Sequence, residues 1–294
     1  MAAMPIARAN GIEICFDTCG EPADPTVLLV MGLGSQMVYW HPELCQGIAD
    51  RGFHVVRFDN RDTGESTHIA QRVDILAIMR GVGSGQPPAV PYLLSDMAAD
   101  AVGLLDHLGI DRAHLFGFSM GGMIVQTIAI EHPQRVRSLT SVMSTTGDTD
   151  VGLPTAEAMA ALMAPPPQSR QAYQDAAVHH AGVWGSPGLY DEELLRRTAG
   201  EAWDRGYDPA GTVRHLAAVM SSGSRSAALA QIAIPTLVIH GTADTLVQPS
   251  GGERTAEVIP DAKLLVIEGM GHDLAPPLWP RLIDALATHA AAHA

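Results

Sequence analysis

Short apolar runs alternate along the chain with longer segments in which apolar residues recur every three or four positions. The short runs are typical of strands covered on both faces, and the longer segments are typical of amphipathic helices packed beside them. Asn10-Gly11 is a hairpin turn signal, so the first two strands are expected to pair antiparallel. The expected strands cover 4–9, 12–18, 27–30, 53–58, 113–116, 138–144, 236–240 and 263–267. This alternation predicts an α/β protein with a mostly parallel eight-stranded sheet flanked by helices.

The strand rhythm disappears between about residues 147 and 230 and then returns. A helical block between two strands of one sheet predicts a cap, inserted after the sixth strand. We therefore expect a core of residues 1–146 and 231–294 and a cap of residues 147–230. Ser95 is predicted to be the N-cap of a helix that ends at Gly109, and residues 81–91 have the Gly and Pro content of a loop. Other helices are expected at 42–51, 71–80, 155–163, 169–181, 191–204, 210–220 and 250–258, and after residue 119 to about 131.

Composition narrows the class of protein. The 294 residues are 47% hydrophobic, which is ample for a buried core, and the formal net charge is −14. Nucleic acids and anionic membranes would repel such a surface, so neither is expected as a partner. No leader segment or bilayer-spanning run is visible, so we expect a cytoplasmic protein. The three cysteines predict no disulfide framework, and no zinc set or other metal site is expected.

Residues 117–121 read Gly-Phe-Ser-Met-Gly between an apolar strand and an apolar helix. A nucleophile elbow requires this context, because the turn is too tight for side chains two positions before and after the serine. Gly117 and Gly121 meet that need. Ser119 would then lie in a strained conformation with its hydroxyl beside the N-terminus of the following helix.

A base and an acid follow two later strands. His272 lies on a glycine-flanked loop after the last strand, and Asp244 follows the strand at 236–240. Open α/β sheets place their sites at the carboxyl ends of strands, and the order Ser119, Asp244, His272 is the one expected here. Asp148 and Asp150, after the strand that follows the elbow, remain alternatives for the acid. The histidines that compete for the base are His114, His132 and His240.

Over nearly its whole length the chain resembles the α/β-hydrolase family. The resemblance is carried by the elbow at 117–121, by Gly-Thr-Ala-Asp at 241–244 and by Gly-Met-Gly-His at 269–272. Residues 59–66 also resemble that family's loop after its fourth strand. Within the family the chain is most similar to bacterial serine carboxylesterases, including the anthracycline methylesterase branch, and we take no substrate from this likeness.

The chemistry explains these residue types. A serine hydroxyl needs a base that removes its proton during attack, which is the role expected of His272 for Ser119. Asp244 would orient the imidazole. The backbone amide of Met120 would donate to the oxyanion of the intermediate. The resemblance implies a second donor, the amide of Leu33, although the chain has Met31-Gly32 where the family often has His-Gly.

The expected function is a cofactor-free serine hydrolase that cleaves carboxylic esters through an acyl-enzyme. Lactonase, perhydrolase or carbon–carbon bond hydrolase activity with the same triad is an alternative, and a non-catalytic ligand-binding protein on a hydrolase scaffold is another. No Arg or Lys cluster lies near the motifs, which favours a neutral, fairly apolar small-molecule ester. Methionine and aromatic side chains can line an adaptable apolar pocket or pack helices together. The candidate pocket residues are Gln36, Trp40, Met159, Met163, Trp184, Trp203 and Met220.

Overall fold

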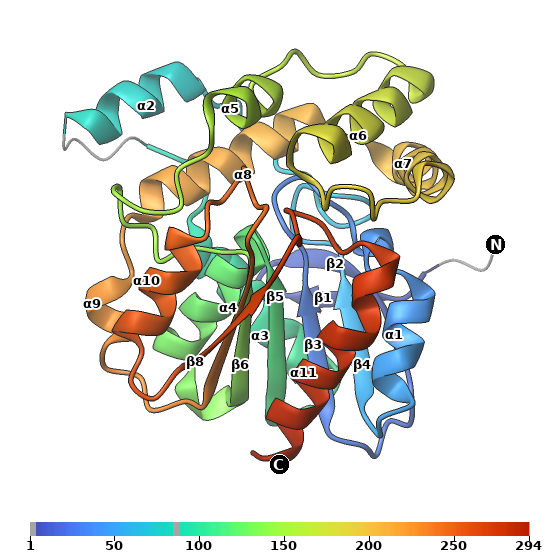
Figure 1. The fold of residues 1–294 in the computed structure, drawn as a ribbon, viewed down its shortest axis with the longest axis vertical. Helices are drawn as coiled ribbons and strands as arrows, with labels where there is room; N and C mark the ends of the chain where they lie inside the picture. The colour runs from blue at the N-terminus through green and yellow to red at the C-terminus, as the bar shows by residue number, and fades with distance from the viewer. Residues whose placement is uncertain (1–3, 85–88, 294) are drawn as a thin grey trace.

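Eight strands form one sheet in the order β1-β2-β4-β3-β5-β6-β7-β8. The computed structural model describes residues 4–84 and 89–293 (Figure 1). β2 is antiparallel to both of its neighbours, and the other five pairings are parallel, which confirms the predicted sheet. The strands are β1 (Ile6–Ala9), β2 (Ile12–Cys19), β3 (Thr26–Val30), β4 (His54–Phe58), β5 (Ala113–Phe118), β6 (Val136–Val142), β7 (Thr236–Gly241) and β8 (Lys263–Ile267).

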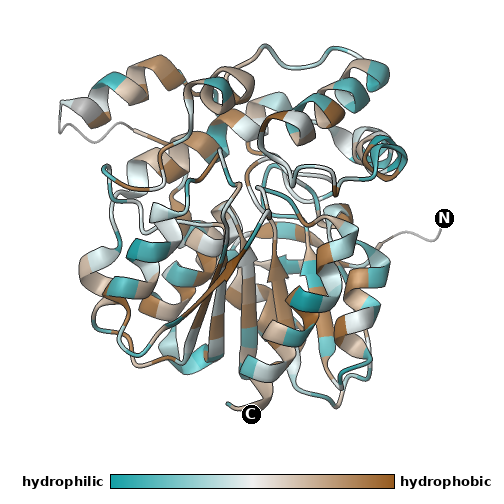
Figure 2. Ribbon diagram, in the orientation of Figure 1, coloured by the Kyte–Doolittle hydropathy of each residue, from teal (hydrophilic) through white to brown (hydrophobic). Residues whose placement is uncertain are grey.

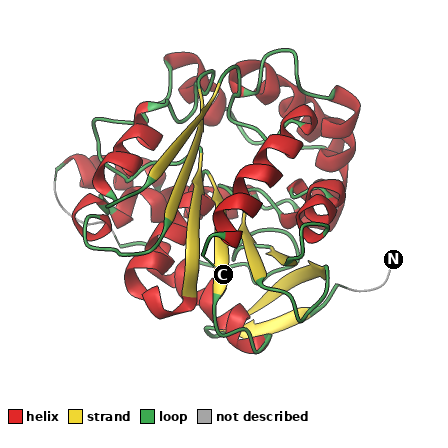
Figure 3. Ribbon diagram, turned by 60° about the horizontal axis from the view of Figure 1, so that its bottom comes forward, coloured by secondary structure: helices red, strands yellow, loops and turns green. Residues whose placement is uncertain are grey.

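Helices cover both faces of the twisted sheet (Figure 3). One face packs on α1 (Pro42–Ala49) and α11 (Trp279–Ala291), and the other on α3 (Leu94–His107), α4 (Met120–Glu131) and α10 (Ser250–Val258). Successive side chains of a strand point to opposite faces, so Leu28 joins one apolar cluster and Leu29 joins the other. This explains why β3 is apolar from Val27 to Val30, on both faces of the sheet. Much of the central sheet is accordingly brown in Figure 2.

Four helices inserted between β6 and β7 lie over the carboxyl ends of the strands (Figure 1). The inserted helices are α5 (Ala156–Leu162), α6 (Arg170–Trp184), α7 (Glu192–Gly206) and α8 (Pro209–Ser222). Each begins at a Ser, Thr or Asp whose side chain accepts a hydrogen bond from the first turn. Such a cap stabilises a helix by about 1 kcal/mol. The short α9 (Ser226–Leu229) then leads to β7, and α2 (Ile75–Gly83) lies beside the inserted helices.

Buried ion pairs join the inserted helices to the loop after β4. Arg205 of α7 contacts the Asp59 carboxylate at 2.8 Å. Arg214 of α8 donates to both oxygens of Asp62, each at 2.8 Å, and also to Asp208. Asp59 and Asp62 are almost completely buried, so each carboxylate depends on its arginine for charge compensation.

The predicted bounds of two elements require correction. The prediction that Ser95 caps its helix is wrong, because α3 begins at Leu94. The Asp96 carboxylate accepts from the Leu93 amide at 2.8 Å, and the Ser95 hydroxyl instead donates to Glu131. The loop expected at 81–91 lies partly outside the described residues, because residues 85–88 are not described, and α2 extends to Gly83. In the part of the chain that is described, none of the helices has the length and apolarity needed to cross a membrane.

Candidate active site

Ser119 lies at the tight turn between β5 and α4, with φ 56° and ψ −120°. A non-glycine residue there carries a strain of about 1–3 kcal/mol, which the surrounding structure must offset. The flanking glycines are required by space. A Cβ at Gly117 would lie 2.2 Å from the Gly121 carbonyl oxygen, and one at Gly121 would lie 1.9 Å from the Val30 carbonyl oxygen. The Ser119 amide donates to the Val142 carbonyl at 2.9 Å, which fixes the turn against β6.

The imidazole of His272 lies against the serine. Its Nε2 is 2.9 Å from Ser119 Oγ, and its side chain is almost completely buried. The end of α6 positions the main chain of this loop, because the His272 amide donates to the Trp184 carbonyl at 2.5 Å. Ser186 adds a second link, since its hydroxyl accepts from the Gly271 amide and donates to the Asp273 carboxylate.

Asp244 lies on the other side of the imidazole. Its Oδ2 is 2.7 Å from His272 Nδ1, and its Oδ1 accepts from the amides of Leu246 and Val247 at 2.9 and 2.8 Å. Burial opposes ionisation of this carboxyl, but the neighbouring imidazoles of His272 and His240 outweigh it and lower the pKa to about 2. A carboxylate accepts only, so it selects the tautomer with the proton on Nδ1. The Nε2 lone pair then faces the Ser119 hydroxyl.

The other candidates for acid and base lie elsewhere. The Asp148 carboxylate accepts from Ser224, Ser226 and Arg254 rather than from His272. His240 has its Nε2 at 2.7 Å from the Val247 carbonyl and at 3.4 Å from Asp244, so the proton goes to the nearer carbonyl oxygen. The structure therefore brings together Ser119, His272 and Asp244.

The two amides expected to form an oxyanion hole belong to segments that adjoin the serine. Met120 is the first residue of α4, where an amide has no partner within the helix. The loop after β3 passes close to the serine, because a Cβ at Gly32 would lie 3.1 Å from Ser119 Cβ. Among the described residues, no protein acceptor takes a hydrogen bond from the amide of Leu33 or of Met120. Both remain available to a ligand.

Two of the predicted pocket residues, Gln36 and Trp40, are buried and packed within the protein. Gln36 is 3% exposed, and its amide nitrogen donates to the Ala202 and Gly206 carbonyls of α7, so it joins this loop to the inserted helices. Trp40 is completely buried in the apolar cluster on the α1 and α11 face, with its ring against Phe116. Both residues lie near Leu33 in the sequence, but nearness in the sequence does not determine the direction of a side chain.

The other predicted pocket residues are spread over all four of the inserted helices α5 to α8. Met159 and Met163, near the end of α5, are 40% and 42% exposed. The indole of Trp184 stacks on His180 at 4.4 Å, and Met220 on α8 is half-buried. Trp203 stacks on Tyr207 of the same segment. These contacts favour helix packing for both tryptophans.

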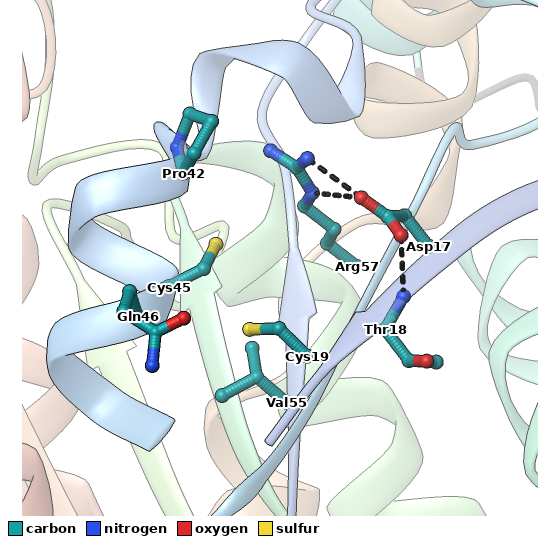
Figure 4. Close-up of a pocket in the computed structure, with 8 residues that line it drawn as sticks. All are labelled: Asp17, Thr18, Cys19, Pro42, Cys45, Gln46, Val55 and Arg57. Atoms are coloured by element: carbon teal, nitrogen blue, oxygen red, sulfur yellow. Dashed lines mark hydrogen bonds and ion pairs between the residues drawn. The ribbon is translucent and has the colours of Figure 1, made fainter. Parts of the chain in front are cut away.

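Two further features of the fold resemble ligand sites. A hollow of about 130 Å³ between α1 and the strands β2 and β4 is lined in part by Cys19, Cys45 and Arg57, and Ser119 does not line it (Figure 4). Possible metal-ligand atoms of Asp62, His68 and Asp208 lie within 4.8 Å of one another. Arg214 already donates to both of these carboxylates, so its charge occupies the position a cation would take.

Comparisons with known proteins extend over nearly the whole chain. A sequence model of the alpha/beta hydrolase fold matches residues 25–275. The chain is 29% identical to rhodomycin D methylesterase DnrP of Streptomyces peucetius, over 97% of this chain and 98% of that protein. It is 30% identical to rhodomycin D methylesterase DauP of Streptomyces sp. (strain C5), over 95% of each. The crystal structure of the enol-lactonase from Burkholderia xenovorans LB400 has a TM-score of 0.75 at 22% identity, covering 98% of this chain and 100% of that one.

Proposed function

The chain belongs to the alpha/beta hydrolase fold family, and we propose that it is a serine hydrolase that cleaves carboxylic esters through an acyl-enzyme. One observation carries this proposal: the strained Ser119, His272 and the buried carboxylate of Asp244 form a continuous chain of hydrogen bonds of 2.9 and 2.7 Å. The methylesterase relatives, which match the chain end to end, support ester hydrolysis as the reaction class.

In the proposed mechanism the Ser119 oxygen attacks the ester carbonyl carbon while His272 Nε2 takes the hydroxyl proton. The C–O bond to the alcohol then breaks, and His272 returns the proton to the departing alkoxide. Water attacks the acyl-enzyme in the same way, again giving its proton to His272, and the acid is released. Asp244 keeps the Nδ1 proton in place and stabilises the imidazolium that forms in each half of the reaction.

The negative charge on the carbonyl oxygen falls between two fixed donors. Among the described residues no protein group accepts a hydrogen bond from the amide of Leu33 or of Met120. Met120 directly follows the serine, and the β3–α1 connection that carries Leu33 passes close to it at Gly32. Removing one such donor typically costs about 10²- to 10³-fold in kcat. No metal or cofactor enters the proposed reaction.

We assign residues 147–230 as a cap over this site and residues 1–146 and 231–294 as the hydrolase core. The position of α5 to α8 over the carboxyl ends of the strands supports the division (Figure 1). The exposed methionines of α5 favour an apolar substrate, because methionine adapts to irregular apolar surfaces. Methyl esters of bulky acids, alongside short p-nitrophenyl esters, are therefore the first substrates to assay.

The test is hydrolysis of p-nitrophenyl butyrate by the wild type and by Ser119→Ala. The variant should lose at least about 10⁴-fold in kcat, since removal of a triad member leaves only binding and the oxyanion hole. Ser95→Ala is the matched control, because it makes the same change on the exposed side of α3 and should behave as the wild type. Diethyl p-nitrophenyl phosphate should add one diethylphosphoryl group, at Ser119. Equal turnover by wild type and Ser119→Ala, or an adduct on another residue, would refute the proposal.

A further inference from the structure

The loop that connects β3 to the next helical turn, residues 31–36 and here called the β3 loop, has no regular secondary structure. Within it, the Ser35 amide donates to the Gly32 carbonyl at 3.2 Å. Gly34, the third residue of this turn, has φ 65°, which is the conformation that type II turns require at that position. The Gly32 carbonyl and the Leu33 N–H belong to the same planar trans peptide unit, so they point in opposite directions. Since the carbonyl faces the Ser35 amide, the Leu33 N–H points away from Ser35.

A histidine of the inserted helix α8 fixes the next peptide unit of this turn. The Gly34 amide donates to His215 Nδ1 at 3.1 Å, and His215 Nε2 lies 2.6 Å from the Arg61 carbonyl oxygen. The carbonyl can only accept, so the imidazole carries its proton on Nε2 and offers a lone pair to Gly34. The two contacts thus require one neutral tautomer and use both ring nitrogens.

The surroundings of His215 favour that neutral form. Its side chain is completely buried, and burial together with the nearby Arg214 and Arg61 lowers the pKa to about 4, although the Arg61 carbonyl and Asp62 oppose the shift. The ring of Tyr92 packs edge-on at 6.4 Å. At neutral pH the histidine is therefore an acceptor for the β3 loop.

A second contact of the same helix limits movement of the loop. A Cβ at Gly34 would lie 2.6 Å from Thr212 Oγ1, so α8 packs directly against the turn. A turn of type II differs from type I by a flip of its central peptide, here the unit that carries the Gly34 amide. The hydrogen bond to His215 can form in only one of these two orientations, and it stabilises that one. The side chain of Met31 is apolar and provides no equivalent bond from within the loop.

We propose that His215 is a positioning residue for the oxyanion hole: by accepting from the Gly34 amide it holds the β3 loop so that the Leu33 amide faces the substrate carbonyl. The inference rests on the proposed function of Ser119 and Leu33. It assigns α8 a part in catalysis in addition to covering the site. His215 does not touch the reacting atoms and acts only through the β3 loop.

The test compares substitutions of His215 that keep one or the other of its two hydrogen bonds, to the Gly34 amide and to the Arg61 carbonyl. In His215→Asn the amide oxygen lies about as far from Cβ as Nδ1 does and can still accept from Gly34. In His215→Gln the amide reaches the position of Nε2 and can still donate to the Arg61 carbonyl, but it leaves Gly34 without an acceptor. His215→Leu removes both bonds. We expect kcat for p-nitrophenyl butyrate to fall about 10- to 100-fold in the Leu and Gln variants, below the full loss of an oxyanion donor, with Asn the most active of the three.

Two readouts separate positioning from a general loss of structure. KM should change less than threefold, and the rate of phosphorylation of Ser119 by diethyl p-nitrophenyl phosphate should fall in parallel with kcat, because its phosphoryl oxygen uses the same donors. His114→Leu is the matched control. His114 is also completely buried with its pKa lowered to about 4, chiefly by burial, but it lies at the amino end of β5 and bonds to Ser138. This control should keep the wild-type kcat.

The outcomes distinguish the inference from the function on which it rests. If Ser119→Ala is inactive but the Asn and Gln variants both keep the wild-type kcat, His215 does not position the hole and only the inference fails. Equal losses in Asn and Gln, a rise in KM alone, or an equal loss in His114→Leu would also overturn it. If Ser119→Ala hydrolyses the ester as the wild type does, the proposed function fails and the inference fails with it. Should the Leu variant not fold, the ranking of Asn over Gln decides.

Discussion

Replacing Asp244 by Asn should reverse the tautomer of His272 while leaving the fold intact. The amides of Leu246 and Val247 donate to Asp244 Oδ1 at 2.9 and 2.8 Å. Both require an acceptor, so the oxygen of the new amide would take that position and its NH₂ group would point at His272 Nδ1. The imidazole would then place its proton on Nε2, facing the serine, and could no longer accept the hydroxyl proton.

The size of the effect follows from the charge that is lost. Asp244 Oδ2 lies 2.7 Å from His272 Nδ1, which puts the centres of the two charges about 4 Å apart. At an effective dielectric constant of about 20, their attraction is worth about 4 kcal/mol, or roughly 10³-fold in rate. The wrong tautomer adds to this loss. We therefore expect kcat/KM to fall by about 10³- to 10⁴-fold, the size measured for the corresponding change in a serine protease.

The assay is kcat/KM for p-nitrophenyl butyrate, with thermal unfolding to show that the variant is folded. Asp148→Asn is the matched control, because Asp148 is held by Ser224, Ser226 and Arg254 and makes no contact with His272. It should keep activity within about twofold of the wild type, as expected for a group outside the reacting set. An inactive Asp148→Asn together with an active Asp244→Asn would refute the assignment of the acid.

Two further predictions concern stability. Arg214→Met leaves the buried Asp62 carboxylate without its partner and should lower the free energy of unfolding by about 3–5 kcal/mol, which would be measured as a lower urea midpoint. The exposed Arg170→Met is the control and should leave the midpoint unchanged. Equal midpoints for the two variants would contradict the prediction. His114 and His215 have pKa values of about 4 in the folded protein, mainly because of burial, against about 6.5 when unfolded. The unfolded chain therefore binds their protons first, so stability is complete above pH 6.5 and falls by about 3 kcal/mol per histidine as the pH drops to 4. In urea titrations at several pH values, His114→Leu should lose less unfolding free energy between pH 6.5 and 4 than the wild type does. An unchanged loss in the variant would count against the prediction.

The elements that the sequence predicts well are those with a strong local pattern. The apolar run at 27–30 falls within β3, and the helix at 250–258 and the strand at 263–267 have the predicted bounds. A continuous apolar run or a helical period depends only on neighbouring residues, so it can be recognised without the fold. The predicted start of α3 is two residues too late, because both Ser95 and Asp96 have side chains that can cap and only the structure distinguishes them.

The same distinction between local pattern and long-range contact applies to the residues of the candidate site. Ser119, Asp244 and His272 could be selected because each follows a strand, and carboxyl ends of parallel strands meet at one edge of the sheet. The contacts of Gln36 could not be predicted, because its partners, the carbonyls of Ala202 and Gly206, are far along the chain. His215 gave no local signal, since a single histidine in an amphipathic helix has many structural uses. Its contact with Gly34 spans 181 positions and depends on how α8 lies over the sheet.

These long-range contacts bear on how the site and the inserted helices depend on each other. The end of α6 supports the His272 loop through the Trp184 carbonyl, and α8 supports the β3 loop through His215. Arg205 of α7 donates to Asp59, whose carboxylate also accepts from the amide of Met37, the residue directly after the β3 loop. Three of the inserted helices therefore contact the loops that carry the proposed base and oxyanion donor. A helix that only covered the substrate would need none of these bonds, so deleting the insertion should misplace the reacting groups as well as open the site.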